Sequence, residues 1–409
     1  MKVVIVGAGI GGLTLALFLH KAKISCEVFE AAPAIRPLGA GLNLLPHATT
    51  AFSELELLDR LLERGVETSE VHFYTHHGQF VDGEPRGRFA GYDVPQISIH
   101  RADLHEVLLS AARERLGDEA VRLGRVCRSV EQDPERVRVN FADPSGAALP
   151  SEEGSVVIAC DGIHSVVRKQ FHPDDSAPID HGTTCFRGVT RWKPFLDGAT
   201  MAYVGTYDTG KLVVYPIRNS IDAEGKQLIN WVIEVKKPND GVRDWNRQVS
   251  IEACIEPFVD WRFEWLDIAS MLRATDEVLQ YPMVDRNPLP FWTRGRVTLL
   301  GDAAHPMLPR GSNGAAQAIL DARLLAELLA TKEPLIALKE YEATRLPATA
   351  DIVLTNRNRS PDEILRIVEE RTGGQPFEQI SDVISRGELD EWQSRYKRVA
   401  GFERERLPQ

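Results

Sequence analysis

Three short apolar runs divide the chain, and each of them leads into a glycine-containing turn. Residues 3–6, 156–159 and 297–300 contain only Val, Ile, Ala, Thr and Leu, a pattern typical of strands buried on both faces of a parallel sheet. Residues 24–30 form a fourth candidate strand, after a helical stretch at 13–22. Strand, turn, helix and strand within about 30 residues match one βαβ unit. We therefore predict an α/β fold whose parallel strands are spread over most of the chain.

A different pattern begins at about residue 180. Tryptophan and tyrosine become frequent and apolar residues alternate with polar ones up to about residue 275, which predicts an antiparallel sheet. We expect a discontinuous nucleotide-binding domain, a sheet domain inserted into it, and a charged helical tail. The expected ranges are 1–75, 97–178 and 276–358 for the first domain, 76–96 and 179–275 for the second, and 359–409 for the tail.

The overall composition is that of an ordinary globular protein rather than of a nucleic-acid-binding or membrane-spanning one. The 409 residues carry a formal net charge of −11, which repels phosphate backbones, so we expect no nucleic-acid partner. No apolar run approaches the roughly 20 residues of a transmembrane helix. The five cysteines are far apart and form no CxxC pair, which favours a reducing, cytoplasmic compartment and no metal site.

The turn after the first strand has the spacing of a dinucleotide fingerprint. In the G-x-G-x-x-G pattern, Gly7 permits a tight turn, Gly9 lets the backbone approach a pyrophosphate, and Gly12 allows close packing of the helix on the strand. Glu30 follows 18 residues after Gly12, where a carboxylate can accept both hydroxyls of an adenosine ribose. A glycine-rich turn without a ligand is the alternative, and this motif alone does not separate NAD from FAD.

A second motif follows the strand at 156–159. Asp161, Ser165 and Arg168 bring an acid, a hydroxyl and a cation close together at the start of a helix. An ordinary capped turn would produce the same pattern. This motif therefore acquires a functional meaning only in combination with the others.

A third motif follows the strand at 297–300. Asp302 lies where a carboxylate can accept hydroxyls, and residues 309–315 then open a long helix. The partial positive charge at such a helix start can stabilise the negative charge of a reduced flavin. A simple helix cap is again the alternative.

In this order and spacing, the three motifs resemble those of the group A flavoprotein aromatic hydroxylases, the family of p-hydroxybenzoate and salicylate hydroxylases. The resemblance runs from residue 2 to about 358 and includes residues 101–104 and 341–345. Four stretches are most similar to family members that modify phenazine carboxylates; these are residues 35–39, 97–101, 280–286 and 311–315. The resemblance implies a Rossmann-like FAD-binding domain of the p-hydroxybenzoate hydroxylase type with an inserted antiparallel substrate sheet.

The resemblance also assigns residues to the cofactor. The expected FAD-binding residues are Gly7, Gly9, Ile10, Gly11, Gly12, Glu30, Arg101, Asp161, Arg168, Asp302, Gly314 and Ala315. Pro309 and Gly311 are expected beside the isoalloxazine ring and are the candidate catalytic positions. The family assigns its counterparts of Asp161 and Arg168 to NAD(P)H as well. No second fingerprint is present for NADH or NADPH, which fits a family in which the nicotinamide is a transient co-substrate.

The substrate side is less clearly marked. No residue between 180 and 275 aligns with the side chains that hold the phenol in p-hydroxybenzoate hydroxylase. Candidates to line a pocket between the inserted sheet and residue 309 are Arg187, Tyr203, Tyr215 and Trp231, and each of them could instead belong to the sheet core. His305 is either a base or a structural residue.

The resemblance implies an NAD(P)H-dependent monooxygenase that transfers one atom of O2 to an aromatic or heteroaromatic substrate through a C4a-hydroperoxide of FAD. We expect a small, fused-ring or heteroaromatic compound with a phenol or a carboxylate, and decarboxylative hydroxylation is one alternative. Two rival functions remain: another FAD enzyme on this fold (an oxidase, a reductase or a halogenase), and a flavin-binding sensor without turnover. The sequence leaves open the choice of NADH or NADPH and whether the protein is a homodimer.

Overall fold

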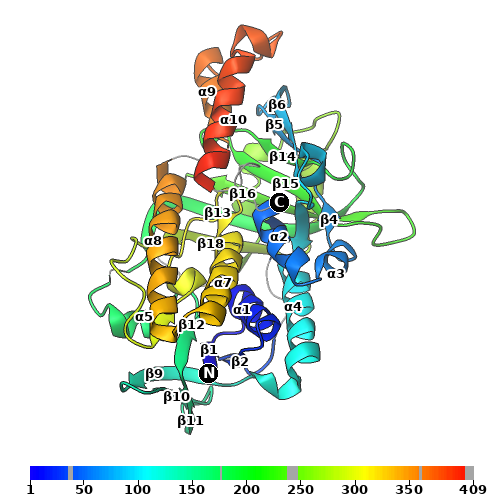
Figure 1. The fold of residues 1–409 in the computed structure, drawn as a ribbon. Helices are drawn as coiled ribbons and strands as arrows, with labels where there is room; N and C mark the ends of the chain where they lie inside the picture. Colours follow the sequence, from blue (N-terminus) through cyan, green and yellow to red (C-terminus); the bar gives the residue numbers. More distant parts are fainter. Residues whose placement is uncertain (36–39, 176, 237–246, 359–361, 401–409) are drawn as a thin grey trace.

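The computed structural model describes residues 1–35, 40–175, 177–236, 247–358 and 362–400. A five-stranded parallel sheet with the order β19-β12-β1-β2-β8 lies near the N-terminus, which is marked beside β1 in Figure 1. Its strands are β1 (Lys2–Val6), β2 (Ser25–Phe29), β8 (Val121–Arg122), β12 (Val156–Ala159) and β19 (Val297–Leu299). The three apolar runs thus lie side by side as β1, β12 and β19, as predicted, because strands without polar side chains are buried on both faces.

Helices cover this sheet and share one apolar core with it. The main ones are α1 (Ile10–Lys21), α4 (Arg101–Leu116), α7 (Asn313–Thr331) and α8 (Pro334–Asn358). α1 packs against both α4 and α7, so its residues from Gly12 to Leu19 are all buried. This explains why the helix is apolar all round instead of amphipathic.

The second large layer is an eight-stranded sheet with the order β17-β18-β13-β16-β15-β14-β5-β6. Its strands are β5 (Glu70–Tyr74), β6 (Phe80–Pro85), β13 (Ile179–Trp192), β14 (Met201–Val204), β15 (Lys211–Arg218), β16 (Gln227–Val235), β17 (Arg247–Val249) and β18 (Val278–Asp285). Neighbouring strands are antiparallel except β14 and β5. The sheet therefore extends beyond the predicted ranges, because β5 precedes residue 76 and β18 follows residue 275.

Smaller elements complete the described chain. Two three-stranded sheets consist of β3 (Gly41–Leu44), β7 (Ile97–His100) and β4 (Val66–Glu67), and of β11 (Ala148–Gly154), β10 (Val137–Ala142) and β9 (Val126–Gln132). Short helices are α2 (Pro46–Glu54), α3 (Leu58–Leu62), α5 (Val166–Phe171) and α6 (Ile268–Arg273). 3-10 turns lie at Gly87–Ala90, Asp118–Ala120, Ile251–Ala253, Glu256–Phe258, Gly301–Ala303 and Ile380–Asp382.

The two faces of the eight-stranded sheet have different partners. Side chains alternate between the faces along each strand, so Leu212 and Val214 join Trp231 in one apolar cluster. Val213 and Tyr215 belong to the opposite face and join a second cluster. This second face is the one that borders the cavity described below.

The C-terminal helices α9 (Glu363–Thr372) and α10 (Arg386–Ala400) lie together at one end of the molecule, beside β14, β5 and β6 (Figure 1). Ile364, Leu365 and Val368 of α9 share an apolar cluster with Phe73 and Tyr203 of the large sheet. The tail therefore packs on the same face of the sheet as the cavity.

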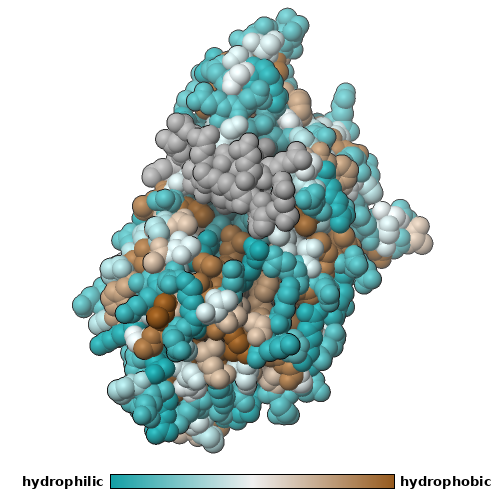
Figure 2. Space-filling view, viewed as in Figure 1, coloured by the Kyte–Doolittle hydropathy of each residue, from teal (hydrophilic) through white to brown (hydrophobic). Residues whose placement is uncertain are grey.

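The exterior carries both hydrophilic and hydrophobic areas. The face drawn in Figure 2 is hydrophilic along its margins, with apolar residues gathered toward its middle. In the described part of the chain, no helix combines the length and the apolar character that a membrane crossing requires. All five cysteines are free thiols.

Candidate active site

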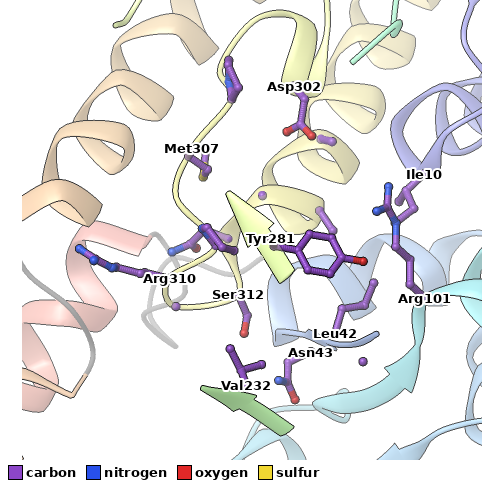
Figure 3. A pocket seen from close by; sticks show the side chains of 18 of the residues that line it. Ile10, Leu42, Asn43, Arg101, Val232, Tyr281, Asp302, Met307, Arg310 and Ser312 are labelled. Carbon is purple, nitrogen blue, oxygen red and sulfur yellow. The ribbon is translucent and has the colours of Figure 1, made fainter. Parts of the chain in front are cut away.

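One continuous cavity of about 380 Å³ runs from the glycine-rich turn to the large sheet. Gly9, Ile10 and Gly11 line one end, and Asp302 with residues 309–315 lines the middle (Figure 3). Its volume lies within the range of about 300–1,000 Å³ that is common for small-molecule sites. The structure thus brings parts of all three sequence motifs to one space.

The fingerprint glycines fit the roles that the sequence predicted for them. Gly7 has a φ of +105°, and a Cβ there would lie 2.3 Å from the carbonyl oxygen of Cys160. A Cβ on Gly12 would lie 2.0 Å from the carbonyl oxygen of Gly7, which shows how closely α1 approaches the turn. A Cβ on Gly9, in contrast, would meet nothing within 4 Å. The backbone at Gly9 is therefore open to a ligand, as a pyrophosphate cradle requires.

Glu30 lies directly after β2, and its carboxylate stabilises the turn. One oxygen accepts a hydrogen bond from the amide of Ala8 at 2.8 Å, and the other accepts from the amide of Ala32 at 2.9 Å. Glu30 does not line the cavity itself. Its contacts place the carboxylate beside the glycine turn, and its contact with the adenosine ribose stays a prediction from the sequence.

Cys160, Gly162 and Ile163 of the second motif line the cavity, but its acidic and basic side chains lie behind the cavity wall. Asp161 caps α5 by accepting from the amide of Val166 at 2.8 Å, whereas its Oδ1 is buried without a hydrogen-bond partner among the described residues. Burial raises the pKa of Asp161. Neither Asp161 nor Arg168 lines the cavity.

The predicted contact of Arg168 with the cofactor is not supported by its position. Only 2% of the side chain is exposed, and Nε lies 2.7 Å from Asp175 Oδ2. Nη1 donates to the carbonyls of Ala303 and Ala304 at 3.1 and 3.0 Å. Arg168 thus connects the turn after Asp302 to Asp175, and its guanidinium contacts protein groups outside the cavity.

The loop before α7 presents an uncapped helix start to the cavity. Gly311 and Ser312 both adopt left-handed φ values, +66° and +59°, and Ser312 makes no capping hydrogen bond. Gly314 and Ala315 of the first turn line the cavity, as do Pro309 and Gly311. The open amides and the helix dipole suit a ligand that gains negative charge, as the reduced flavin ring does.

The buried carboxylate of Asp321 stabilises the turn that carries Asp302. Asp321 accepts from His305 Nε2 at 2.6 Å, from Arg345 Nε at 2.7 Å and from the amide of Gly301 at 3.2 Å. Burial alone would raise the pKa of Asp321, but His305 and Arg345 outweigh it and lower the pKa to about 2. His305 is engaged by Asp321 and does not line the cavity, which favours its structural role over that of a base.

The end of the cavity at the large sheet, which is the expected substrate end, contains three of the four predicted residues. Arg187, Tyr203 and Tyr215 line it. Trp231 does not, and the prediction for this residue was wrong because of strand parity. The neighbouring Val232 faces the cavity, whereas Trp231 is fully buried in the opposite cluster.

Tyr281 was not among the predicted substrate residues, yet it projects from β18 into the cavity (Figure 3). The Arg187 guanidinium lies over its ring, 5.0 Å from the centroid, and Arg187 Nε donates to Cys185 Sγ at 3.4 Å. Burial raises the pKa of Tyr281 and of Tyr215, so both remain neutral phenols beside this cation. Arg310, from the stretch 309–315 that was expected beside the flavin, lines the cavity as well. Lys211 and Glu234 also line it and were not predicted, since no local sequence pattern marks them.

These features define a flavoprotein whose cofactor site opens onto an apolar and cationic pocket for a second ligand. The sequence profile described as "FAD binding domain" matches residues 1–355. The chain belongs to this family of FAD-dependent aromatic hydroxylases, and its cofactor is FAD. Use of NAD(P)H is typical of the family. No group of three or more potential metal ligands occurs in the residues that the structure describes.

Among named relatives, a phenazine 1,6-dicarboxylic acid hydroxylase from Lysobacter antibioticus is 41% identical over 370 residues, covering 88% of this chain and 90% of the relative. A 3-amino-4-hydroxybenzoate 2-monooxygenase from Streptomyces cremeus is 33% identical, with 86% and 85% covered. A solved salicylate hydroxylase substrate complex shares the fold with a TM-score of 0.72 at 25% identity and 98% coverage of both chains. The protein is therefore an FAD-dependent aromatic monooxygenase.

Proposed function

We propose that this monooxygenase hydroxylates a planar, fused-ring or heteroaromatic carboxylate, and that Arg187 binds the substrate carboxylate. The observation that carries this proposal is the position of Arg187. Its guanidinium lines the substrate end of the cavity, and it forms no ion pair with a carboxylate among the described residues. A cation at the wall of an apolar pocket favours an anionic ligand group, because burial of an unpaired charge is costly.

The remaining surroundings of Arg187 suit an aromatic ring. Tyr215 and Tyr281 offer neutral phenol groups, while Val213 and Val232 provide apolar contact on the same face. The named relatives add independent support, since phenazine dicarboxylic acid, aminohydroxybenzoate and salicylate are all aromatic carboxylates. A phenazine carboxylate is the first substrate to test, because the relative named for such a compound has the highest identity of the three.

Within this proposal the chain's own residues bind, orient and shield the reactants. FAD, reduced by NAD(P)H, supplies the oxygen-activating chemistry. Gly9 and the residues around it hold the pyrophosphate, Asp302 the ribityl chain, and the start of α7 the charge on the flavin ring. A homodimer and a cytoplasmic location remain predictions from the sequence.

The experiment compares carboxylated and uncarboxylated rings. We expect phenazine-1,6-dicarboxylate or phenazine-1-carboxylate to accelerate NAD(P)H oxidation, and unsubstituted phenazine to do so poorly. Arg187→Met should raise KM for the carboxylate by about 10- to 100-fold, since a hydrogen-bonded charge pair contributes roughly 1.5–3 kcal/mol. Arg187→Lys should recover part of this loss, because it retains the charge but not the fork.

Arg191→Met is the matched control, because Arg191 is an exposed arginine on the same strand, β13. It should leave KM unchanged. An Arg187→Met variant with the wild-type KM for the carboxylate, or equal turnover of unsubstituted phenazine by the wild type, would rule out the proposed carboxylate site.

A further inference from the structure

Five polar side chains from distant segments meet at the substrate end of the cavity. Lys211 begins β15 and Glu234 lies near the end of β16. Arg310 belongs to the loop before α7, Tyr207 precedes β15, and Asp362 immediately precedes α9 of the C-terminal tail. We call these five residues the Lys211 cluster. Three of its members, Lys211, Glu234 and Arg310, line the cavity.

The contacts within the Lys211 cluster form a chain from the tail to the flavin-side loop. Lys211 Nζ lies 3.1 Å from Asp362 Oδ2 and 3.2 Å from Glu234 Oε1. Lys211 Nζ also donates to the Tyr207 hydroxyl at 3.1 Å, and that hydroxyl donates to Glu234 Oε2 at 2.6 Å. The ammonium group of Lys211 therefore contacts both Glu234 and Tyr207, which are also hydrogen-bonded to each other.

Arg310 extends this network of contacts to the loop before α7. Its Nε lies 3.8 Å from Glu234 Oε2, and its guanidinium lies over the Tyr207 ring at 5.4 Å from the centroid. Nη1 donates to the carbonyl of Asn356 at 3.0 Å. Arg310 is the neighbour of Gly311, so its position sets the course of the loop that lines the middle of the cavity.

Among the residues that the structure describes, the charges of the Lys211 cluster balance, and all four charged side chains are buried. Two cations, Lys211 and Arg310, face two anions, Glu234 and Asp362, and each of these side chains is at most 9% exposed. Removing one partner from such a set leaves an uncompensated buried charge, which the remaining groups can relieve only by moving. Asp362 is the member that the tail contributes, so the tail is electrostatically tied to the cavity wall.

We propose that the C-terminal tail is a working part of the active site: Asp362 positions Lys211, Glu234 and Tyr207, which in turn hold Arg310 and the flavin-side loop over the substrate. The apolar packing of α9 on the large sheet fixes Asp362 in place. Asp362 is thus a positioning residue that acts through Lys211. This inference rests on the proposed function for its kinetic readout, but not for its structural one.

A loosened loop has a chemical consequence that can be measured. When substrate and loop are not held together, the two electrons of NAD(P)H and two protons convert O2 to H2O2, and no oxygen atom enters the substrate. We expect Asp362→Asn to raise KM for the aromatic carboxylate about tenfold and to divert a larger share of NAD(P)H into peroxide. The dissociation constant for FAD, measured by flavin fluorescence, should change less than about twofold, because the glycine turn expected to hold the FAD pyrophosphate lies outside the Lys211 cluster.

A second readout needs no substrate. Arg310 is buried, and trypsin cleaves after arginine only when a segment opens. Cleavage after Arg310 in the FAD-bound protein, followed by mass spectrometry, should become about tenfold faster in Asp362→Asn. If no carboxylate stimulates the wild type, the proposed function fails while this test of the tail still stands.

Two further variants sharpen the result. Asp382→Asn changes an exposed carboxylate in the same tail and should match the wild type in every readout. Tyr207→Phe removes only the hydroxyl between Lys211 and Glu234, without changing charge, and serves if Asp362→Asn does not fold; it should also increase peroxide formation. Wild-type KM, peroxide yield and cleavage rate in a folded Asp362→Asn or Tyr207→Phe protein would overturn the proposal. So would a loss confined to FAD affinity.

Discussion

The Asp321 carboxylate binds three groups near the expected cofactor site, and its replacement by asparagine should weaken these contacts. The side chain is fully buried and accepts hydrogen bonds from His305, from Arg345 and from the amide of Gly301. Asparagine keeps the shape but removes the charge. The largely buried Arg345 cation then loses its counter-ion, and the amide of Gly301 in the turn that carries Asp302 loses a charged acceptor.

The expected loss of stability follows from two independent figures. Breaking one side of a buried ion pair costs about 3–5 kcal/mol. The lowering of the pKa of Asp321 from its usual 3.8 to about 2 corresponds to about 2 kcal/mol. A depressed carboxyl pKa stabilises the folded protein fully above the unfolded-state value, and the contribution is lost as the pH falls toward about 2. The difference between the wild type and Asp321→Asn should therefore be largest near neutral pH and shrink in acid.

Thermal unfolding of the apoprotein measures this directly. Asp321→Asn should lower Tm by roughly 4–10 °C near pH 7, and FAD should bind more weakly because the Asp302 turn is less well held. Glu327→Gln is the control, since Glu327 is an exposed carboxylate on the same helix, α7. A Tm within about 1 °C of the wild type, at the precision of such scans, would refute the view that Asp321 organises this side of the cavity.

Three further substitutions test the placement of single residues. Gly12→Ala puts a Cβ 2.0 Å from the carbonyl oxygen of Gly7, so we expect little folded, yellow protein after purification. Glu30→Gln keeps only one good acceptor for the amides of Ala8 and Ala32 and should weaken FAD binding about tenfold in fluorescence titrations, whereas unchanged affinity would remove Glu30 from the cofactor site. Trp231→Phe should lower Tm by several degrees, because it loses packing and hydrogen bonds of the indole. It should leave KM within about twofold of the wild type. A large rise in KM would show that Trp231 influences substrate binding.

The cofactor side could be predicted from the sequence because local rules determine it. A G-x-G-x-x-G turn between an apolar strand and a helix can adopt few backbone conformations. Gly7, Gly9 and Gly12 have the backbone geometry and free space expected for such a turn. The buried runs at β12 and β19 could be recognised for the same reason. β12 pairs in parallel with β1, and β19 pairs in parallel with β12, so Asp161 and Asp302 follow their strands at the same edge of the sheet.

The substrate side depends on parity and on long-range pairing, which the sequence does not display. Trp231 and Val232 are neighbours on β16 and therefore point to opposite faces of the sheet. Residue type alone favoured the aromatic residue as a cavity wall, whereas Val232 is the one that faces the cavity. The Lys211 cluster draws on segments up to 155 positions apart, from Tyr207 to Asp362. No periodicity connects such positions. The contacts of Arg168 could not be predicted for a related reason, since its partners Ala303 and Ala304 come from a later motif.

The most direct test of the central claim is the fate of labelled oxygen. Purified protein with FAD, NAD(P)H, ¹⁸O2 and a phenazine carboxylate is followed by mass spectrometry of the product, together with NAD(P)H consumption and peroxide formation. The account predicts one ¹⁸O atom in each hydroxylated product and one NAD(P)H oxidised per product. Unlabelled aromatic compound with stoichiometric peroxide, or no substrate-dependent oxidation of NAD(P)H with any planar aromatic carboxylate, would contradict it.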